Sequence, residues 1–167
     1  MTADPVMAAV LHAVGVGQAG DRAAARRALE SLWTELGPDG DALHRCTLAH
    51  FLADLMDDPA SALDWDLRAL AAADAVTEDR AHRHHAGLDI AAFAPSLHLN
   101  AADDHRRLGD VDAAREHLAA ARAAASRLPE GPYGDGVRTA IDEVADAVDR
   151  GDTTERSSAP GARPGAG

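Results

Sequence analysis

The sequence predicts an all-α protein, and three observations lead to this fold class. Of its 167 residues, 46% are hydrophobic, yet only 3% are aromatic. Alanine, which has the highest intrinsic helix propensity, supplies much of the apolar content. The chain also contains no run of β-branched or aromatic residues long enough to supply a strand. A chain of this length is typically one domain, and we expect it to cover residues 1–150.

The first predicted helix begins near the N-terminus. Val6, Val10 and Val14 lie four residues apart, which is the spacing of one helix face and not the alternation of a strand. Asp4 and Pro5 precede them and suit the N-cap and the first turn of a helix. We therefore expect a helix to begin at Asp4-Pro5.

Clusters of Gly, Pro and Asp divide the remaining chain into further helical segments. The polar segment 77–89 has no clear periodicity, and Pro95 is expected near the first turn of the regular part of its helix. The tail 151–167 lacks core-forming residues and is predicted to be disordered. Helices are predicted over 21–36, 42–56, 60–76, 90–108, 111–128 and roughly 136–149.

The stretch VGVGQAGD matches G-x-G-x-x-G at Gly15, Gly17 and Gly20. A dinucleotide-binding loop of this pattern has to follow a strand and open a βαβ unit. A helix leads into this stretch instead, so we interpret it as a helix end followed by a turn. Gly15 and Gly17 each cost a helix about 1 kcal/mol relative to alanine, and we expect them to allow a close backbone contact.

Composition excludes several classes of function. All 16 basic residues are arginine, which rules out catalysis through a lysine Schiff base or a P-loop lysine. The formal net charge of −12 disfavours nucleic acid and anionic membranes and favours a basic or neutral partner. Cys46 is alone, so no intramolecular disulfide forms. No basic leader region or membrane-length apolar run is present, and a cytoplasmic protein is expected.

A similar helix–turn–helix pattern recurs three times along the chain. In each case an Asp ends a short turn, and a small residue follows four positions later. Such hairpins cannot bury their apolar faces alone, and they therefore stack on one another. The three turns are Gly20-Asp21 before Ala25 and Leu29, Asp58 before Ala62 and Ala69, and Gly109-Asp110 before Ala114 and Leu118.

This pattern resembles the tetratricopeptide repeat family, in which the second helix of each repeat carries A-x3-F. The resemblance spans about residues 5–128, with Ala13 and Ala102 at small positions of first helices. It implies a short stand-alone bacterial α-solenoid of three hairpins, with 136–149 as a capping helix. The sequence departs from the family where aromatic residues are expected, with Asp66 at a Phe position and Cys46, Ala53, His98 and His105 at others.

The resemblance also implies a binding surface. In tetratricopeptide proteins the first helix of each hairpin lines a concave groove that binds peptides. The expected function is a non-catalytic adaptor or regulatory scaffold for a protein or peptide, with no cofactor and no catalytic residue. Carried over position by position, the groove residues are Met7, Val10, Val14, Gln18, His44, Thr47, Phe51, Asp54, Ser96, Leu99, Asp103 and Arg106.

Two other classes of function stay open at this point. His82, His85 and Asp89 would share one helix face, and imidazole and carboxylate groups are good ligands for transition metals. A metal-binding protein or small enzyme using the histidines between 82 and 105 is therefore an alternative, and a self-assembly module is another. Cys46 with His50 is a candidate nucleophile pair. The sequence leaves the oligomeric state and the role of the tail open.

Overall fold

The structure is a computed structural model that describes residues 4–78 and 84–158, with side chains described outside 77–91. The prediction of an all-α protein is confirmed for this part of the chain, which contains no strand. No helix in the described ranges is both long and apolar enough to cross a membrane. The helices are α1 (Pro5–Gln18), α2 (Arg22–Leu36), α3 (Ala42–Asp54), α4 (Pro59–Glu78), α5 (His84–Arg107), α6 (Val111–Ala125) and α7 (Pro132–Asp149).

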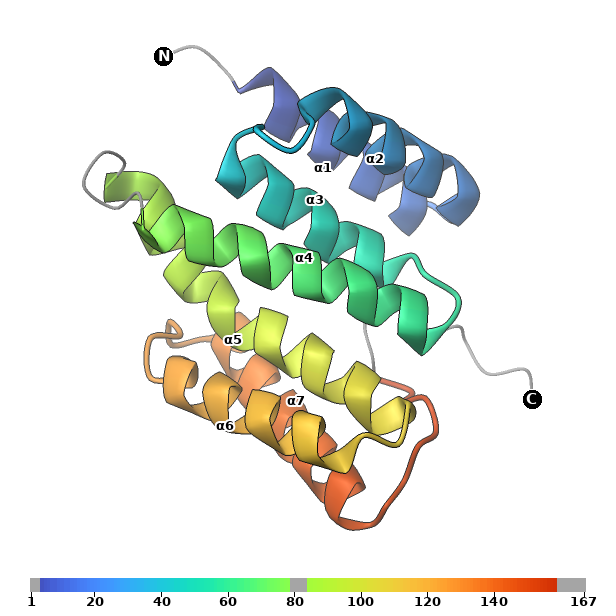
Figure 1. Cartoon of the computed structure of the whole chain (residues 1–167), viewed down its shortest axis with the longest axis vertical. Coiled ribbons are helices and arrows are strands. Elements are labelled where there is room, and N and C mark those ends of the chain that lie inside the picture. Colours follow the sequence, from blue (N-terminus) through green and yellow to red (C-terminus); the bar gives the residue numbers. More distant parts are fainter. Residues whose placement is uncertain (1–3, 79–83, 159–167) are drawn as a thin grey trace.

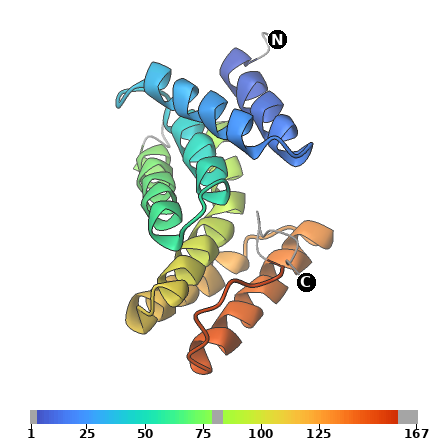
Figure 2. The ribbon, with the colours of Figure 1, turned by 90° about the vertical axis from the view of Figure 1, so that its right-hand side faces the viewer.

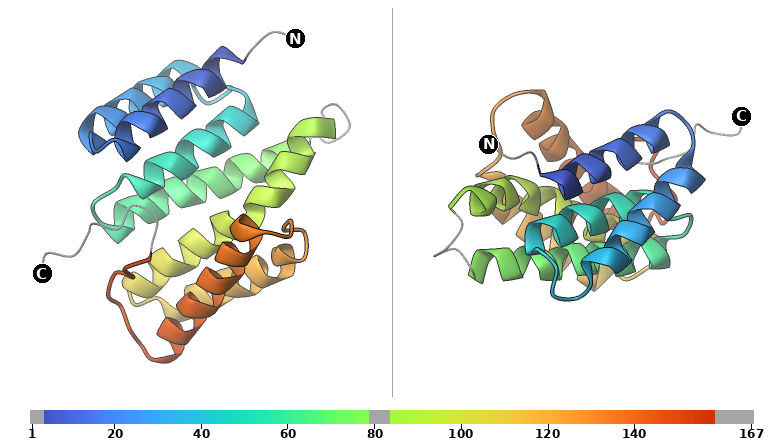
Figure 3. Two further views of the ribbon diagram at one scale, coloured as in Figure 1. Left: turned by 180° about the vertical axis from the view of Figure 1, so that it is seen from behind. Right: turned by 90° about the horizontal axis from the view of Figure 1, so that it is seen from above.

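Successive helices pack as antiparallel pairs: α1 with α2, α3 with α4, and α5 with α6 (Figure 1). The second helix of each pair also packs against the first helix of the next, and α7 lies against both α5 and α6. The first helices contact one another in order, α1 with α3, α3 with α5, and α5 with α7. Figures 2 and 3 show from other sides how the pairs follow one another along the long axis of the molecule.

The turns between paired helices use the same chemistry at both ends of the chain. Gly20 and Gly109 have φ values of 110° and 81°, a left-handed conformation that favours glycine. The aspartates that follow are N-caps: Asp21 Oδ1 accepts from Ala24 N at 2.9 Å, and Asp110 Oδ1 accepts from Ala113 N at 3.2 Å. These bonds satisfy backbone N–H groups that a helix start leaves unpaired.

Small and apolar residues of the recurring pattern form the core. Ala25 and Leu29 of α2 are fully buried, and so is Ala114 of α6. Alanine at these places lets two helices approach closely, and the larger neighbours fill the space between pairs. Trp33 and Trp65 meet edge to face at 5.1 Å between ring centroids and connect the first two pairs.

The last helix covers the third pair with one apolar stripe. Val137, Ile141, Val144 and Val148 are buried in the same cluster as Leu118 of α6. This confirms the stripe expected from the sequence. The helix begins at Pro132 and not near 136. Proline is favourable in the first turn of a helix, where a backbone N–H group would have no partner within the helix.

The Pro95 prediction was wrong, because α5 is continuous from His84 to Arg107 and places Pro95 inside it. An internal proline removes one backbone hydrogen bond. The Pro95 ring is fully buried, and this packing offsets part of that loss.

Gly17 and Gly15 differ in their surroundings. A Cβ atom at Gly17 would lie 3.1 Å from Cβ of Ala25 on α2 and 3.8 Å from a Leu55 methyl group, whereas one at Gly15 would meet nothing within 4 Å. The expected close contact therefore exists at Gly17, where α1 crosses α2, and not at Gly15.

Of the tail 151–167 that was predicted to be disordered, the structure describes 151–158, and 159–167 lie outside the described residues. Arg106 of α5 donates through Nη2 to the Thr154 carbonyl at 2.7 Å and through Nη1 to the Asp152 carbonyl. Arg156 forms ion pairs with Asp103 and with Glu143 of α7, at 3.3 and 2.9 Å. Long-range ion pairs thus hold a segment that has no core-forming residues. We call residues 151–158 the C-terminal strap.

Candidate functional site

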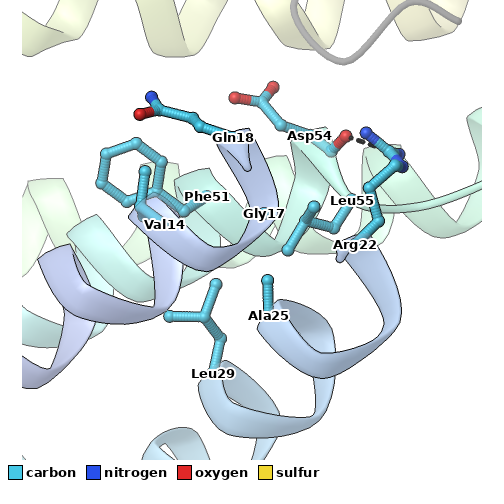
Figure 4. A pocket seen from close by; sticks show the side chains of 9 residues that line it. All are labelled: Val14, Gly17, Gln18, Arg22, Ala25, Leu29, Phe51, Asp54 and Leu55. Atoms are coloured by element: carbon cyan, nitrogen blue, oxygen red, sulfur yellow. Dashed lines mark hydrogen bonds between the residues drawn. The ribbon is translucent and has the colours of Figure 1, made fainter. Parts of the chain in front are cut away.

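One apolar pocket of about 340 Å³ lies where α1, α2 and α3 meet. Figure 4 shows that side chains from all three helices line it. The Arg22 guanidinium donates to the Asp54 carbonyl at 3.2 Å at one side. We call this the α1–α3 pocket, and its lining residues are Val14, Gly17, Gln18, Arg22, Ala25, Leu29, Phe51, Asp54 and Leu55.

A second apolar pocket of about 500 Å³ lies between α3, α5, α7 and the C-terminal strap. The Ser96 hydroxyl and the Tyr133 hydroxyl are 3.0 Å apart at its wall. We call it the α3–α7 pocket. Its lining residues are His50, Phe51, Phe93, Ser96, Leu99, Asn100, Pro132, Tyr133, Gly136, Val137, Ala140, Arg156 and Ser158.

Phe51 lines both apolar pockets. It is half-buried on α3, the second of the three first helices, and it packs against the buried cluster that contains Leu48 and Leu52. The two hollows therefore share one aromatic wall, and together they form a surface along α1, α3 and α5 that we call the groove. Such a surface can bind apolar side chains of one ligand on both sides of the Phe51 ring.

A third hollow of about 50 Å³ is polar and lies between the C-terminal end of α3, the start of α4 and the C-terminal half of α5. Asp54 lines both this hollow and the α1–α3 pocket. We call it the acidic pocket. Its lining residues are Ala53, Asp54, Met56, Ala62, Asp66, Asn100, Asp103, Asp104, Arg107 and Glu155.

Asp66 and Asp104 face each other in the acidic pocket and share a side-chain hydrogen bond. Asp66 is 2% exposed, and within the described residues Asp66 Oδ1 and Asp104 Oδ2 have no hydrogen-bond partner. Burial raises the pKa of Asp66 well above its usual value, and the Asp104 charge raises it further. Burial also raises the pKa of Asp104 to about 7, although its hydrogen bond with Asp66 opposes this. The two carboxyl groups therefore share a proton.

Asp54 adds a third carboxyl group to the same region. Burial raises the pKa of Asp54 to about 7, and the nearby Arg22 guanidinium opposes that shift. Asp103, by contrast, is already paired: Arg106 Nε donates to Oδ1 at 2.8 Å, and Arg156 Nε lies 3.3 Å from Oδ2. The acidic pocket therefore has one neutralised aspartate and three whose pKa values are raised.

Seven of the twelve groove residues predicted from the sequence line these hollows. They come from all three first helices, and Phe51 is central among them. Val14, Gln18, Phe51 and Asp54 line the α1–α3 pocket, Phe51, Ser96 and Leu99 line the α3–α7 pocket, and Asp54 and Asp103 line the acidic pocket.

The other five lie elsewhere. Val10 is 0% exposed in the core, because its face of α1 turns toward α2 and α3. Thr47 is buried and its hydroxyl donates to the Leu43 carbonyl at 2.9 Å. Arg106 is buried and holds the C-terminal strap. Met7 is half-buried outside these pockets, and His44 Nε2 lies 2.6 Å from Asp4 Oδ2.

Three histidines of α5 and α6 lie together. His98 Nδ1 lies 3.1 Å from Nδ1 of His117 on α6, and His105 stacks on His117 with ring centroids 5.4 Å apart. Burial lowers the pKa of both His98 and His117. The candidate ligand His82 and the side chains of His85 and Asp89 lie outside the described residues. Within the part described, no three His, Cys, Asp or Glu side chains could hold a metal ion together.

The candidate pair of Cys46 and His50 is not activated. Burial raises the pKa of the Cys46 thiol to about 12 and lowers the pKa of His50 to about 4. Both groups are therefore neutral near pH 7, whereas a nucleophilic cysteine needs its thiolate form.

Sequence reasoning missed Asp66 and Asp104 as members of a site. One signal did exist, because Asp66 occupies a position at which the repeat pattern has a buried aromatic residue. A carboxyl group at a core position predicts either a partner or a shifted pKa. Its partner on α5 lies 38 residues later, and only the packing of α4 on α5 brings the two together.

No protein-family model, no curated protein and no solved structure matches this chain.

Proposed function

We propose that this protein is a non-catalytic adaptor that binds a peptide segment of a partner protein in its groove. The observation that carries the proposal is Phe51, whose ring borders both apolar pockets on the first helices of successive pairs. Pockets joined in this way suit a ligand that presents two or more apolar side chains along its length, as an extended or helical peptide does.

The order of helix contacts supports a short solenoid of the tetratricopeptide kind as the scaffold. Each first helix contacts the next first helix, and each second helix contacts the following first helix. The small residues Ala25, Ala69 and Ala114 of the repeat pattern are all fully buried. In such arrays the first helices line the concave face, which is the usual binding surface.

The charge of the protein favours a basic or neutral peptide. The formal net charge is −12, and Asp54 stands at the edge of the α1–α3 pocket. Long-range attraction would increase the rate at which a basic segment associates and would disfavour an acidic one. The groove offers shape and hydrogen bonds, and we assign it no chemical step, in line with the neutral state of Cys46 and His50.

The proposal is tested by selecting peptides that bind the full-length chain from a displayed library of random 12-residue peptides. We expect the selected peptides to carry apolar residues and to lose at least tenfold in affinity for Phe51→Ala, as measured by isothermal titration calorimetry. Truncating a central aromatic contact typically costs about 2 kcal/mol or more. Leu11→Ala, at a residue 57% exposed on α1 outside the groove, is the matched control.

A second variant separates binding from stability, since Phe51 also packs against the core. Gln18 is exposed and lines the α1–α3 pocket, so Gln18→Trp should obstruct that pocket without altering the interior. If Phe51→Ala and Gln18→Trp are folded by circular dichroism and bind the selected peptides as the wild type does, the groove is not the binding surface. If this protein enriches no peptide more strongly than a control helical protein of similar charge does, the proposal of peptide binding is wrong.

A further inference from the structure

We propose that the acidic pocket binds the cationic end of a lysine or arginine side chain belonging to the peptide in the groove. This inference rests on the proposed function and adds the chemistry of one subsite to it. The pocket gathers carboxyl groups from three helices: Asp54 from α3, Asp66 from α4 and Asp104 from α5.

The strongest observation is an incomplete set of hydrogen bonds at a deeply buried carboxyl group. Asp66 is 2% exposed, lines the acidic pocket, and has an Oδ1 atom with no partner in the described part of the chain. Oδ2 of Asp104, in the same pocket, also has none. A buried polar atom without a partner is costly, and a buried carboxylate is more costly still. A ligand that brings N–H donors and a positive charge would relieve both costs.

The arginines among the described residues leave these two oxygens unpaired. Arg106 and Arg156 pair with Asp103, on one side of the pocket. Arg107 lines the pocket and lowers the pKa of Asp104 through its charge, yet no described residue forms a hydrogen bond with Asp104 Oδ2. Glu155 of the C-terminal strap lines the same pocket and adds a further negative charge.

The size of the pocket selects the class of cation. A volume of about 50 Å³ accommodates an ammonium or guanidinium group and not a whole residue. The described residues include no group of three side chains placed to hold a metal ion, so a cation that donates through N–H groups fits better than a bare metal. Guanidinium and ammonium groups make short, charge-assisted hydrogen bonds with carboxylates.

The position of Asp54 connects this pocket to the groove. Asp54 lines both the acidic pocket and the α1–α3 pocket, and Phe51 lies one helical turn earlier on α3. A peptide that places an apolar side chain beside Phe51 therefore has the acidic pocket within reach of a neighbouring basic side chain. That side chain has an apolar stem and a charged end, which suits a pocket reached from an apolar surface.

The protonation of Asp104 gives this binding a pH dependence. A cation binds better once this carboxyl group has lost its proton, because the pocket then carries more negative charge. Since burial raises the pKa of Asp104 to about 7, affinity should increase between pH 6 and pH 8. Besides Asp66 and Asp104, the charged groups that face the pocket are Asp54, Asp103, Arg107 and Glu155, with Arg22 beside Asp54.

A titration with blocked amino acids, followed by NMR on the full chain at constant ionic strength, tests the subsite. The probes are the N-acetyl methylamides of arginine and lysine, with that of citrulline as the uncharged analogue of arginine. We expect the basic probes to shift the amides around the acidic pocket, to bind at least threefold more tightly at pH 8 than at pH 6, and to lose at least tenfold in affinity for Asp66→Asn. Asp64→Asn, exposed on the same helix, is the matched control.

Three results would overturn the proposed subsite. The first is equal binding of the arginine and citrulline probes, and the second is equal binding of the arginine probe to wild type and Asp66→Asn. The third is displacement of the basic probes by millimolar Mg²⁺ or Zn²⁺, which would assign the pocket to a metal. Asp66→Asn keeps the size of the side chain and should fold, which thermal melting verifies.

The peptide selection separates this inference from the proposed function. Selected peptides that depend on Phe51, contain no basic residue and bind Asp66→Asn normally would refute the subsite and leave the groove intact. Binding of the arginine probe without any selected peptide would refute the groove and keep the cation site. Peptides in which a basic residue is required, and which lose affinity for both Phe51→Ala and Asp66→Asn, would support both.

Discussion

At the scale of single residues, the buried carboxyl groups determine how the protein responds to pH. A group whose pKa is raised on folding binds its proton more tightly in the folded state, so its contribution to stability declines as the pH rises. The pKa of Asp104 rises from 3.8 in the unfolded chain to about 7 in the folded protein. Its contribution to stability is therefore lost as the pH rises from 3.8 to about 7. His50, with its pKa lowered to about 4, acts in the opposite direction between pH 4 and 6.5 and masks part of this effect.

We therefore expect Asp104→Asn to become more stable relative to the wild type as the pH rises from 4 to 7.5. One pKa unit corresponds to about 1.4 kcal/mol, and the full effect belongs to the coupled pair with Asp66. Thermal melts of both proteins at half-unit pH intervals measure it, and the His50 contribution cancels in the difference. Exposed Asp39→Asn is the control, and parallel Tm curves for Asp104→Asn and wild type would contradict the prediction.

At the scale of elements, helix ends and the C-terminal strap are held by arginine and aspartate side chains. The repeated Gly-Asp turns follow from local chemistry, since a left-handed glycine followed by an N-cap aspartate requires only a few neighbouring residues. The strap is different. Its ion pairs connect Arg106 with the strap backbone and Arg156 with two helices, so it depends on partners far away in the sequence.

Arg156→Gln should loosen the strap. The Arg156 side chain is 11% exposed and pairs with Asp103 and Glu143, so its removal leaves two carboxylates with fewer partners. We expect about tenfold faster amide exchange across 152–158, equivalent to about 1.4 kcal/mol, as measured by hydrogen-exchange mass spectrometry. Arg127→Gln, at an exposed arginine on the other end of the third pair, should leave the exchange unchanged. An unchanged rate in Arg156→Gln would mean that Arg106 alone holds the strap.

At the scale of the whole molecule, each helix packs mainly on its neighbours in the chain. The last helix contacts α5 and α6, and its buried stripe belongs to a different core cluster from that of α1 and α2. Because this packing is local, we expect one end of the molecule to open while the other stays folded.

Ile141→Ala tests this property. Ile141 is 2% exposed in the cluster with Val144 and Leu118, and removing such a side chain costs about 2–5 kcal/mol. We expect exchange protection to fall in α6 and α7 and to persist in α1 and α2, whereas Thr139→Ala on the exposed face of α7 changes neither. If α1 and α2 lose protection as much as α7 does, the chain unfolds as one cooperative unit.

The sequence by itself determined the all-α class, the order of the helices, the Gly-Asp turns and the apolar stripe of α7. These features depend on residues within one or two helical turns of each other, so periodicity and capping preferences suffice to predict them. The resemblance to the tetratricopeptide repeat, carried over position by position, also pointed to Phe51 and Asp54, and both line the pockets.

Only the tertiary structure decided which candidate residues are accessible and which groups meet. Val10 and Phe51 were both expected in the groove, but the rotation of each helix against its neighbours buries Val10 and leaves Phe51 between two pockets. The meeting of Asp66 with Asp104 follows from the packing of α4 on α5. Long-range packing of this kind has no periodicity in the sequence, and it is what creates the acidic pocket.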